Sequence, residues 1–163
     1  MTLLDLFARL PESPCGEAEK WAEGRNADEA AYLACERGDH MLWIAEVLGV
    51  DRRLLVLAAC DCAERTLRFA WAQDVPVLRE TLRVARAWTR GEATIEEVRA
   101  VEAARAAAAG TWAREEARAA GAASRAAREE AAAAWAAEHR ACADIVRRHI
   151  PWSMIAPLVE GLK

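Results

Sequence analysis

The chain has 163 residues, of which 54% are hydrophobic, and its net charge is −4. Forty residues are alanine, 23 of them between Ala100 and Ala143, whereas glycine and proline together number only 13. Because alanine is the strongest helix former, this composition excludes an all-β or doubly wound fold and predicts an all-α protein. The length fits a single domain.

Two short helices are predicted before residue 25. Residues 2–10 place Leu3, Leu4, Phe7 and Leu10 on one side of a helix, and Pro11 ends it. A second helix is expected from Cys15 to about Glu23, where apolar residues recur at helical spacing. Both segments read as amphipathic helices that cover a core.

Two further helices are expected before residue 50. Asn26 followed by Glu29 matches a capping box at the start of the third helix, which should end at Gly38. Asp39 is then expected to cap the fourth helix, and Gly49 to close it.

A long apolar helix is predicted after Asp51, over residues 52–72, as the most buried helix of the fold. With the turn before it, this segment matches a helix-turn-helix pattern. A recognition helix presents polar side chains to base edges, however, and this one is Leu, Val and Ala on nearly all sides. Nucleic acid is therefore not expected as a partner. Pro76 should open the next helix, which Gly91 ends.

The alanine-rich segment predicts one long helix over residues 95–150, opened by a capping box of Thr94 and Glu97. A continuous helix of this size would be about 80 Å long at about 1.5 Å per residue, which exceeds a compact domain. Two arrangements remain open: a helix that bends, or one that breaks near Gly110 or Gly121 and folds back. The bent helix is favoured because one or two residues make a tight reversal.

The expected organisation is a single all-α domain over residues 1–163. It comprises a helical bundle at 1–91, the long alanine-rich helix at 94–150, and a short closing helix at 151–163 that follows Pro151.

Charge is uneven along the chain. Residues 1–50 hold ten acidic and four basic residues. Four acidic residues of this segment are candidates for binding a basic partner protein: Glu12, Glu17, Glu19 and Glu23. The alternative role of these acids is solubility. They do not converge at spacings that suit a catalytic pair or a metal site.

Four arginines lie on one face of the helix that follows Pro76: Arg79, Arg83, Arg86 and Arg90. They form a candidate docking stripe for an acidic partner or for phosphates. Alternatively, they form a solvated face that the acidic N-terminal third of the chain partly neutralises. On the alanine-rich helix, Trp112 and Trp135 are candidate anchors for a partner or for a homo-oligomer.

The five cysteines are an odd number, and the N-terminus lacks the pattern of a secretory signal. No uncharged apolar run is long enough to span a membrane. We therefore expect a cytoplasmic protein with free thiols and no membrane partner. Cys60 and Cys62 point about 200° apart on a helix and cannot share one metal ion.

A metal or redox module remains an alternative that would draw on cysteines and one histidine: Cys15, Cys35, Cys60, Cys62, His139 and Cys142. Sequence spacing places no histidine beside a thiol, so no catalytic residue is expected. No cofactor and no metal are expected either.

Several segments together resemble a known family: CGEAEKW at 15–21, the run from Ala31 to Ala70, WTRGEATIEEVRA at 88–100, the alanine tract, and CADIVRRHIPW at 142–152. They are similar to the fifth family of immunity proteins of bacterial polymorphic toxin systems, which also occurs in phages. The resemblance implies an all-α protein that binds and neutralises a cognate toxin domain and has no catalytic residues.

The positions that match the family pattern are Cys35, Arg37, Asp39, Trp43, Asp51, Arg52, Arg53, Cys60, Cys62, Cys142, Asp144 and Arg147. Most of them are interpreted as structural, with Trp43 in the core and Asp144 paired with Arg147 or Arg148. The expected function is non-enzymatic protein binding of the immunity type. The alternative is a structural or self-assembling helical protein of a bacterium or phage.

Overall fold

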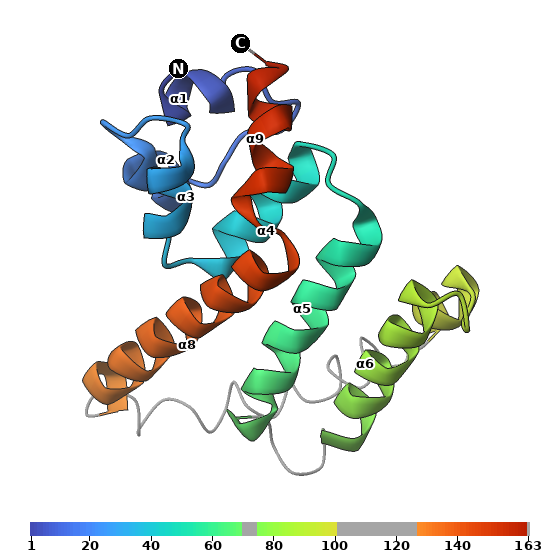
Figure 1. Ribbon diagram of the computed structural model, residues 1–163. Helices are drawn as coiled ribbons and strands as arrows, with labels where there is room; N and C mark the ends of the chain where they lie inside the picture. The colour runs from blue at the N-terminus through green and yellow to red at the C-terminus, as the bar shows by residue number, and fades with distance from the viewer. Residues whose placement is uncertain (70–74, 101–126, 163) are drawn as a thin grey trace. The chain divides into compact units, whose positions relative to one another are not determined.

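The computed structural model describes residues 1–69, 75–100 and 127–162, apart from the side chains of residues 66, 69 and 127–135. The chain is mostly helical, and the described residues contain no strand beyond one isolated bridge between Thr2 and Asn26, which confirms the all-α class (Figure 1). The elements are α1 (Leu3–Phe7), α2 (Gly16–Ala22), α3 (Glu29–Ala34), α4 (Gly38–Val47), α5 (Arg52–Thr66), η1 (Leu67–Phe69), α6 (Val75–Thr89), α8 (Ala127–His149) and α9 (Trp152–Glu160).

The chain divides into two compact units. Unit 1 comprises Met1–Ala59 and His139–Lys163, and unit 2 comprises Cys60–Glu138. The boundaries between the units fall inside α5 and inside α8. They do not coincide with residues 91 and 94, where the sequence suggested that the helical bundle ends and the alanine-rich helix begins.

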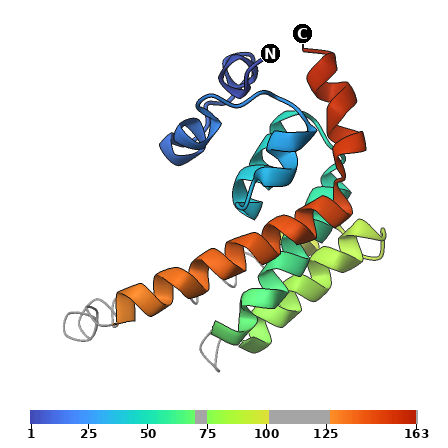
Figure 2. The same cartoon turned by 60° about the vertical axis from the view of Figure 1, so that its left-hand side comes forward.

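Unit 1 is built around large apolar side chains that are almost completely buried: Leu6, Met41, Val146, Ile150 and Ile155. Helix α9 packs on α3, where the rings of Tyr32 and Trp152 lie 5.7 Å apart. Figure 2 shows α8 running into α9 through the sharp turn at Pro151. The hydroxyl of Tyr32 donates to the carbonyl of Ile150 at the end of α8, so one side chain fixes α3 to this turn.

Four predicted helix ends are confirmed. The Asp51 carboxylate accepts from the Arg53 amide at 2.9 Å and caps α5. Gly49 and Gly91 both have positive φ, at 84° and 76°, where helices end. Thr94 and Glu97 exchange the two hydrogen bonds of a capping box, and residues 95–100 are helical.

Two predicted caps were wrong. The third helix is capped by Asp28 instead of Asn26, because the Asp28 carboxylate accepts from the Ala31 amide at 3.0 Å. Asp39 does not cap α4, which begins at Gly38; its carboxylate binds the Arg37 guanidinium instead. A side chain that completes an ion pair with its neighbour is not available to the helix amides.

Three predicted helices are shorter in the structure. The first ends at Phe7, the third at Ala34, and the apolar helix after Asp51 at Thr66, where a 3-10 turn follows. Of residues 95–150, which the sequence predicts as one long alanine-rich helix, the structure describes a helical segment at 95–100 and α8, and the prediction of one helix stays untested. Gly110 and Gly121, where a bend or break was expected, lie outside the described residues.

Unit 2 brings the end of α5 and η1 against α8 through a buried carboxylate. Glu138 is 5% exposed, and its carboxylate binds the guanidinium groups of Arg65 and Arg68. Both arginines remain partly exposed, so only the carboxylate end of this cluster is desolvated.

Candidate functional site

Several positions singled out in the sequence meet in unit 1, where the first residue of α4 lies against α8: Cys35, Arg37, Asp39, Cys142, Asp144 and Arg147. A Cβ atom on Gly38 would lie 2.7 Å from the Cβ of Cys142 and 2.8 Å from its carbonyl carbon. Only a residue without a side chain fits there. The close approach of the two helices thus depends on glycine at the first residue of α4.

The side chain of Arg147, on α8, binds the C-terminal end of α3. Its guanidinium donates to the carbonyl oxygens of Leu33, at 2.8 Å, and of Cys35, and it pairs with Asp144 at 2.7 Å. These carbonyls end a helix and have no partner within it. Arg147 therefore acts as a side-chain cap across 112 residues of sequence. The predicted pairing of Asp144 with Arg147 is confirmed.

Arg37 joins α2 to the start of α4. Its guanidinium binds Glu17 at 2.7 Å and Asp39 at 2.7 Å. The hydrogen bonds from Arg37 lower the pKa of Asp39 to about 2, against the opposing effect of partial burial. The His139 ring lies 3.7 Å from the same carboxylate.

These contacts support a structural role for the residues of the family pattern in this junction. Cys35 is buried, and burial raises the pKa of its thiol. Trp43 is half-buried and meets Phe7 edge-on at 5.5 Å. Arg52 and Arg53 are exposed in the first turn of α5, whereas Cys62 is half-buried in unit 2.

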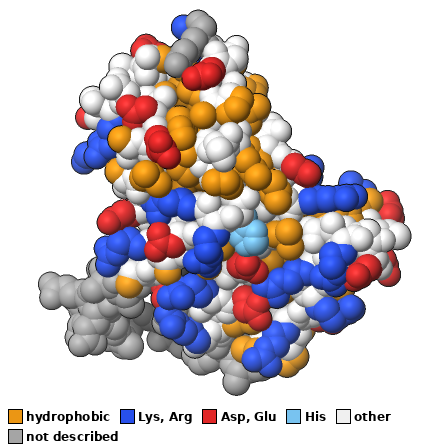
Figure 3. Space-filling view, in the orientation of Figure 1, with side chains coloured by type: hydrophobic (Ala, Val, Ile, Leu, Met, Phe, Trp, Pro, Cys, Tyr) orange, Lys and Arg blue, Asp and Glu red, His pale blue; other side chains and the backbone are white. Residues whose placement is uncertain are grey.

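The acidic candidates all lie on the outside of unit 1, on α2 and the segments flanking it. Glu12, Glu17, Glu19 and Glu23 are exposed. Glu17 is bound to Arg37, whereas the other three form no ion pair with any basic side chain that the structure describes. On the face shown in Figure 3, acidic side chains stand among apolar ones in this part of the molecule.

The arginine stripe lies on α6 in unit 2, where its four members line one open depression. Three of the four guanidinium groups are paired: Arg83 with Glu80, Arg86 with Asp61 and Glu64, and Arg90 with Glu92. The hydrogen bonds that the Arg86 guanidinium donates to the carboxylates of Asp61 and Glu64 raise the pKa of Arg86. The acids that neutralise the stripe are thus its neighbours in unit 2. Arg79 is exposed and has no ion pair among the described residues.

The two tryptophan candidates are not placed by the structure. Trp112 and the side chain of Trp135 lie outside the part of the chain that it describes. Their proposed role as interface anchors stays a prediction.

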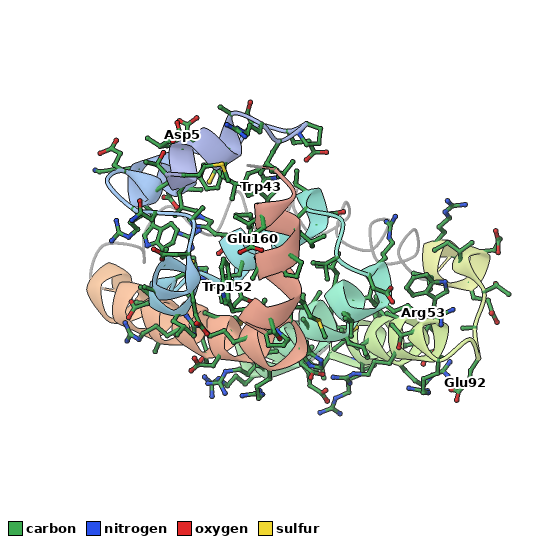
Figure 4. All side chains as sticks on the ribbon, turned by 45° about the horizontal axis from the view of Figure 1, so that its top comes forward. Asp5, Trp43, Arg53, Glu92, Trp152 and Glu160 are labelled. Atoms are coloured by element: carbon green, nitrogen blue, oxygen red, sulfur yellow. The ribbon has the colours of Figure 1, made fainter. Side chains whose placement is uncertain are left out.

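Unit 1 contains a partly open apolar cavity of about 50 Å³ among the aromatic side chains of α1, α3, α4 and α9, including Trp43 and Trp152 (Figure 4). An engineered apolar cavity that admits benzene measures about 150 Å³. The cavity is therefore too small for a ligand of that size.

One pair of side chains was missed by the sequence reasoning. The Sγ atom of Cys15 lies 3.7 Å from Nε2 of His40, which is 25 residues away. His40 lines the cavity, and its Nδ1 atom is buried without a hydrogen-bond partner among the described residues. Nothing in the local sequence signals this contact, because the packing of α2 against α4 creates it.

The remaining thiols form no ligand cluster in the described residues. None of the five cysteines forms a disulfide: Cys15 is exposed, Cys35 and Cys60 are buried, and Cys62 and Cys142 are half-buried. The part of the chain that is described holds no group of three or more His, Cys, Asp or Glu side chains that could bind a metal. Its helices are also too short or too polar to span a membrane.

Comparisons with family models, with curated proteins and with solved structures gave no significant match.

Proposed function

We propose that this chain is a non-enzymatic protein-binding protein of the immunity type, which neutralises a cognate toxin domain by occluding it. The observation that carries the proposal is the acidic surface of unit 1. Over residues 1–36 the chain has eight acidic and three basic residues, a net charge of −5. The exposed carboxylates of Glu12, Glu19 and Glu23 are not neutralised by any described basic side chain.

An exposed surface with excess negative charge attracts a basic partner and speeds its association. The helices beneath this surface are held in place by backbone hydrogen bonds. Helix α1 is tied to the segment after α2 by the bonds from Leu3 to Arg25 and from Ala27 to Met1, at 2.9 and 3.0 Å. A rigid surface loses little conformational freedom on binding. The expected partner surface is a basic face of the toxin domain.

The arginine stripe supports a partner role less strongly, because three of its four guanidinium groups already have carboxylate partners. The alternative of a self-assembling helical protein rests on the alanine-rich segment, most of which is not described. We therefore place the interface on the acidic surface.

The first test asks whether a large secreted protein with a variable C-terminal domain is encoded beside the gene for this chain, and the experiment uses that C-terminal domain. The domain is expressed in bacterial cells with and without the chain, and the association rate and affinity of the purified proteins are measured by surface plasmon resonance at several salt concentrations. We expect rescue of growth and an association rate that falls steeply with salt. The absence of both rescue and binding would refute the immunity role.

A charge-reversal triple variant locates the interface. Changing Glu12, Glu19 and Glu23 to Lys should weaken binding about a hundredfold, mainly through slower association. The charge-matched control reverses three exposed acids elsewhere: Glu46, Glu96 and Glu160. Equal effects of the two triple variants would show that net charge, and not this surface, drives binding.

A further inference from the structure

The contact between Cys15 and His40 gives unit 1 a feature that protein binding does not require. Cys15 is the residue before α2, and its side chain makes no capping hydrogen bond there. The thiol is exposed and its sulfur contacts the imidazole of His40, in the first turn of α4, at 3.7 Å. A nucleophile beside a base is the arrangement that activates a thiol.

The state of the imidazole decides which role it can take. Partial burial lowers the pKa of His40. Among the charged groups that face it, Asp39 and Glu17 raise this pKa, whereas Arg37 and His139 lower it. The ring is therefore neutral near neutral pH and available as a proton acceptor. For Nε2 to accept, the ring hydrogen must lie on Nδ1, the atom in the cavity wall.

We propose that Cys15 is a thiol–disulfide exchange site with His40 as its general base, selective for cationic low-molecular-weight disulfides. The thiol proton passes to Nε2 of His40 as Sγ attacks one sulfur of the disulfide. A new S–S bond joins Cys15 to that half, and the old S–S bond breaks. The other half leaves as a thiolate and takes the proton back from the imidazolium. Cys15 is oxidised to a mixed disulfide, and the leaving half is reduced.

The charge around the thiol selects the disulfide. Cys15 lies in sequence between the exposed acids Glu12 and Glu19, neither of which pairs with a described basic side chain, on the segment where negative charge is in excess. This field raises the local concentration of a cationic disulfide and repels an anionic one. The site is thus expected to prefer cystamine over glutathione disulfide.

Cys15 is the exposed cysteine among the five, so a disulfide reagent should react with it first. Cys35 and Cys60 are buried, and burial raises the pKa of both thiols, so neither is reactive in the folded protein. Cys62 and Cys142 are partly covered. Modification at low reagent concentration should therefore stop after one equivalent.

The test treats the folded full chain with cystamine at neutral pH and maps the product by peptide mass. Cys15 should carry the first equivalent and react about tenfold or more faster than the same cysteine in urea, since a positioned base contributes at least that factor. Glutathione disulfide should react more slowly than cystamine, and salt should reduce the difference. A folded-state rate no higher than the rate in urea would overturn the proposal without any variant.

Two variants test whether the reactivity of Cys15 depends on His40 as a base or only on the exposure of the thiol. His40→Gln should reduce the rate at Cys15 about tenfold or more, because glutamine cannot accept the proton. His149→Gln makes the same change at another partly buried histidine of unit 1 and should leave the rate unchanged. Modification that begins at Cys62 or Cys142, or a His40→Gln rate equal to that of the wild type, would also overturn the proposal. The result does not bear on toxin binding, which has its own assay.

Discussion

At the residue scale, a few polar side chains hold unit 1 together across long stretches of sequence. Arg147 binds two backbone carbonyls at the end of α3, and Tyr32 binds the carbonyl at the end of α8. Each of these carbonyls would otherwise be left without a partner in a partly buried position. An unpaired carbonyl in such a position lowers the stability of the fold, so substitutions at Arg147 and Tyr32 should be destabilising.

Arg147→Ala should destabilise the protein by about 2–4 kcal/mol, because it leaves two carbonyls and the Asp144 carboxylate without their donor. Arg147→Lys should lower the free energy of unfolding by less, because the lysine ammonium keeps the positive charge. Some loss should remain, since an ammonium lacks the planar fork with which arginine binds both carbonyls. Urea denaturation measures both. The exposed neighbour Arg148 is the control, and Arg148→Ala should change stability by less than about 0.5 kcal/mol. An equal loss of stability in Arg147→Ala and Arg148→Ala would contradict the role of Arg147 as a side-chain cap of α3.

Asp39 should make stability depend on pH in the acid range. Its pKa is about 2 in the folded protein, below the ordinary value of 3.8, so the ionised form stabilises the fold. This contribution is complete above about pH 4 and is lost as the pH falls from about 4 to 2. The side chain is half-exposed, so solvent screening reduces the contribution to about 1 kcal/mol.

Denaturation at several pH values compares the wild type with Asp39→Asn. The variant should lose less stability than the wild type between about pH 4 and pH 2. Salt should narrow the difference, because the ion pair with Arg37 is partly exposed. An identical pH dependence in the two proteins would show that Asp39 does not contribute in this range.

At the scale of elements, the crossing of α4 and α8 sets the geometry of unit 1. The two helices meet at Gly38 and Cys142 with no room for a side chain. The capping box at Thr94 could be read from adjacent residues, whereas this crossing joins segments about a hundred residues apart. Local patterns define where helices begin, but they do not define which helices touch.

Gly38→Ala should destabilise the protein by about 1–3 kcal/mol, because the added Cβ would meet Cys142 at 2.7 Å and backbone atoms that cannot rotate away. Gly16→Ala is the matched control in α2. Its Cβ would meet nothing within 4 Å, so alanine there should stabilise the protein by about 0.5–1 kcal/mol. Thermal unfolding distinguishes the two signs. A stabilising Gly38→Ala would contradict the close crossing.

At the scale of the whole molecule, the large buried side chains that the structure describes are unevenly shared between the two units. The five largest fully buried side chains in the described residues all belong to unit 1. In the described part of unit 2, the buried side chains are small or polar, apart from Val84: Cys60, Ala87, Thr89 and Glu138. Burial of apolar area is the main source of local stability, so the two units should differ in protection.

Amide hydrogen exchange should therefore be slowest in unit 1. We expect the amides of residues 143–150, around Val146 and Ile150, to exchange more slowly than those of α6. Exchange measured by peptide mass resolves the two segments. Equal or stronger protection of α6 would show that its packing contributes more than the described burial indicates.

The sequence by itself determined the helical class, the caps at Asp51 and Thr94, and the glycine-ended helices, because each depends on residues within a few positions of one another. Only the tertiary structure decided that Arg147 clamps α3, that Asp39 binds Arg37 instead of capping α4, and that His40 meets Cys15. These contacts depend on how separate helices pack, and helical periodicity fixes a buried face without specifying its partner.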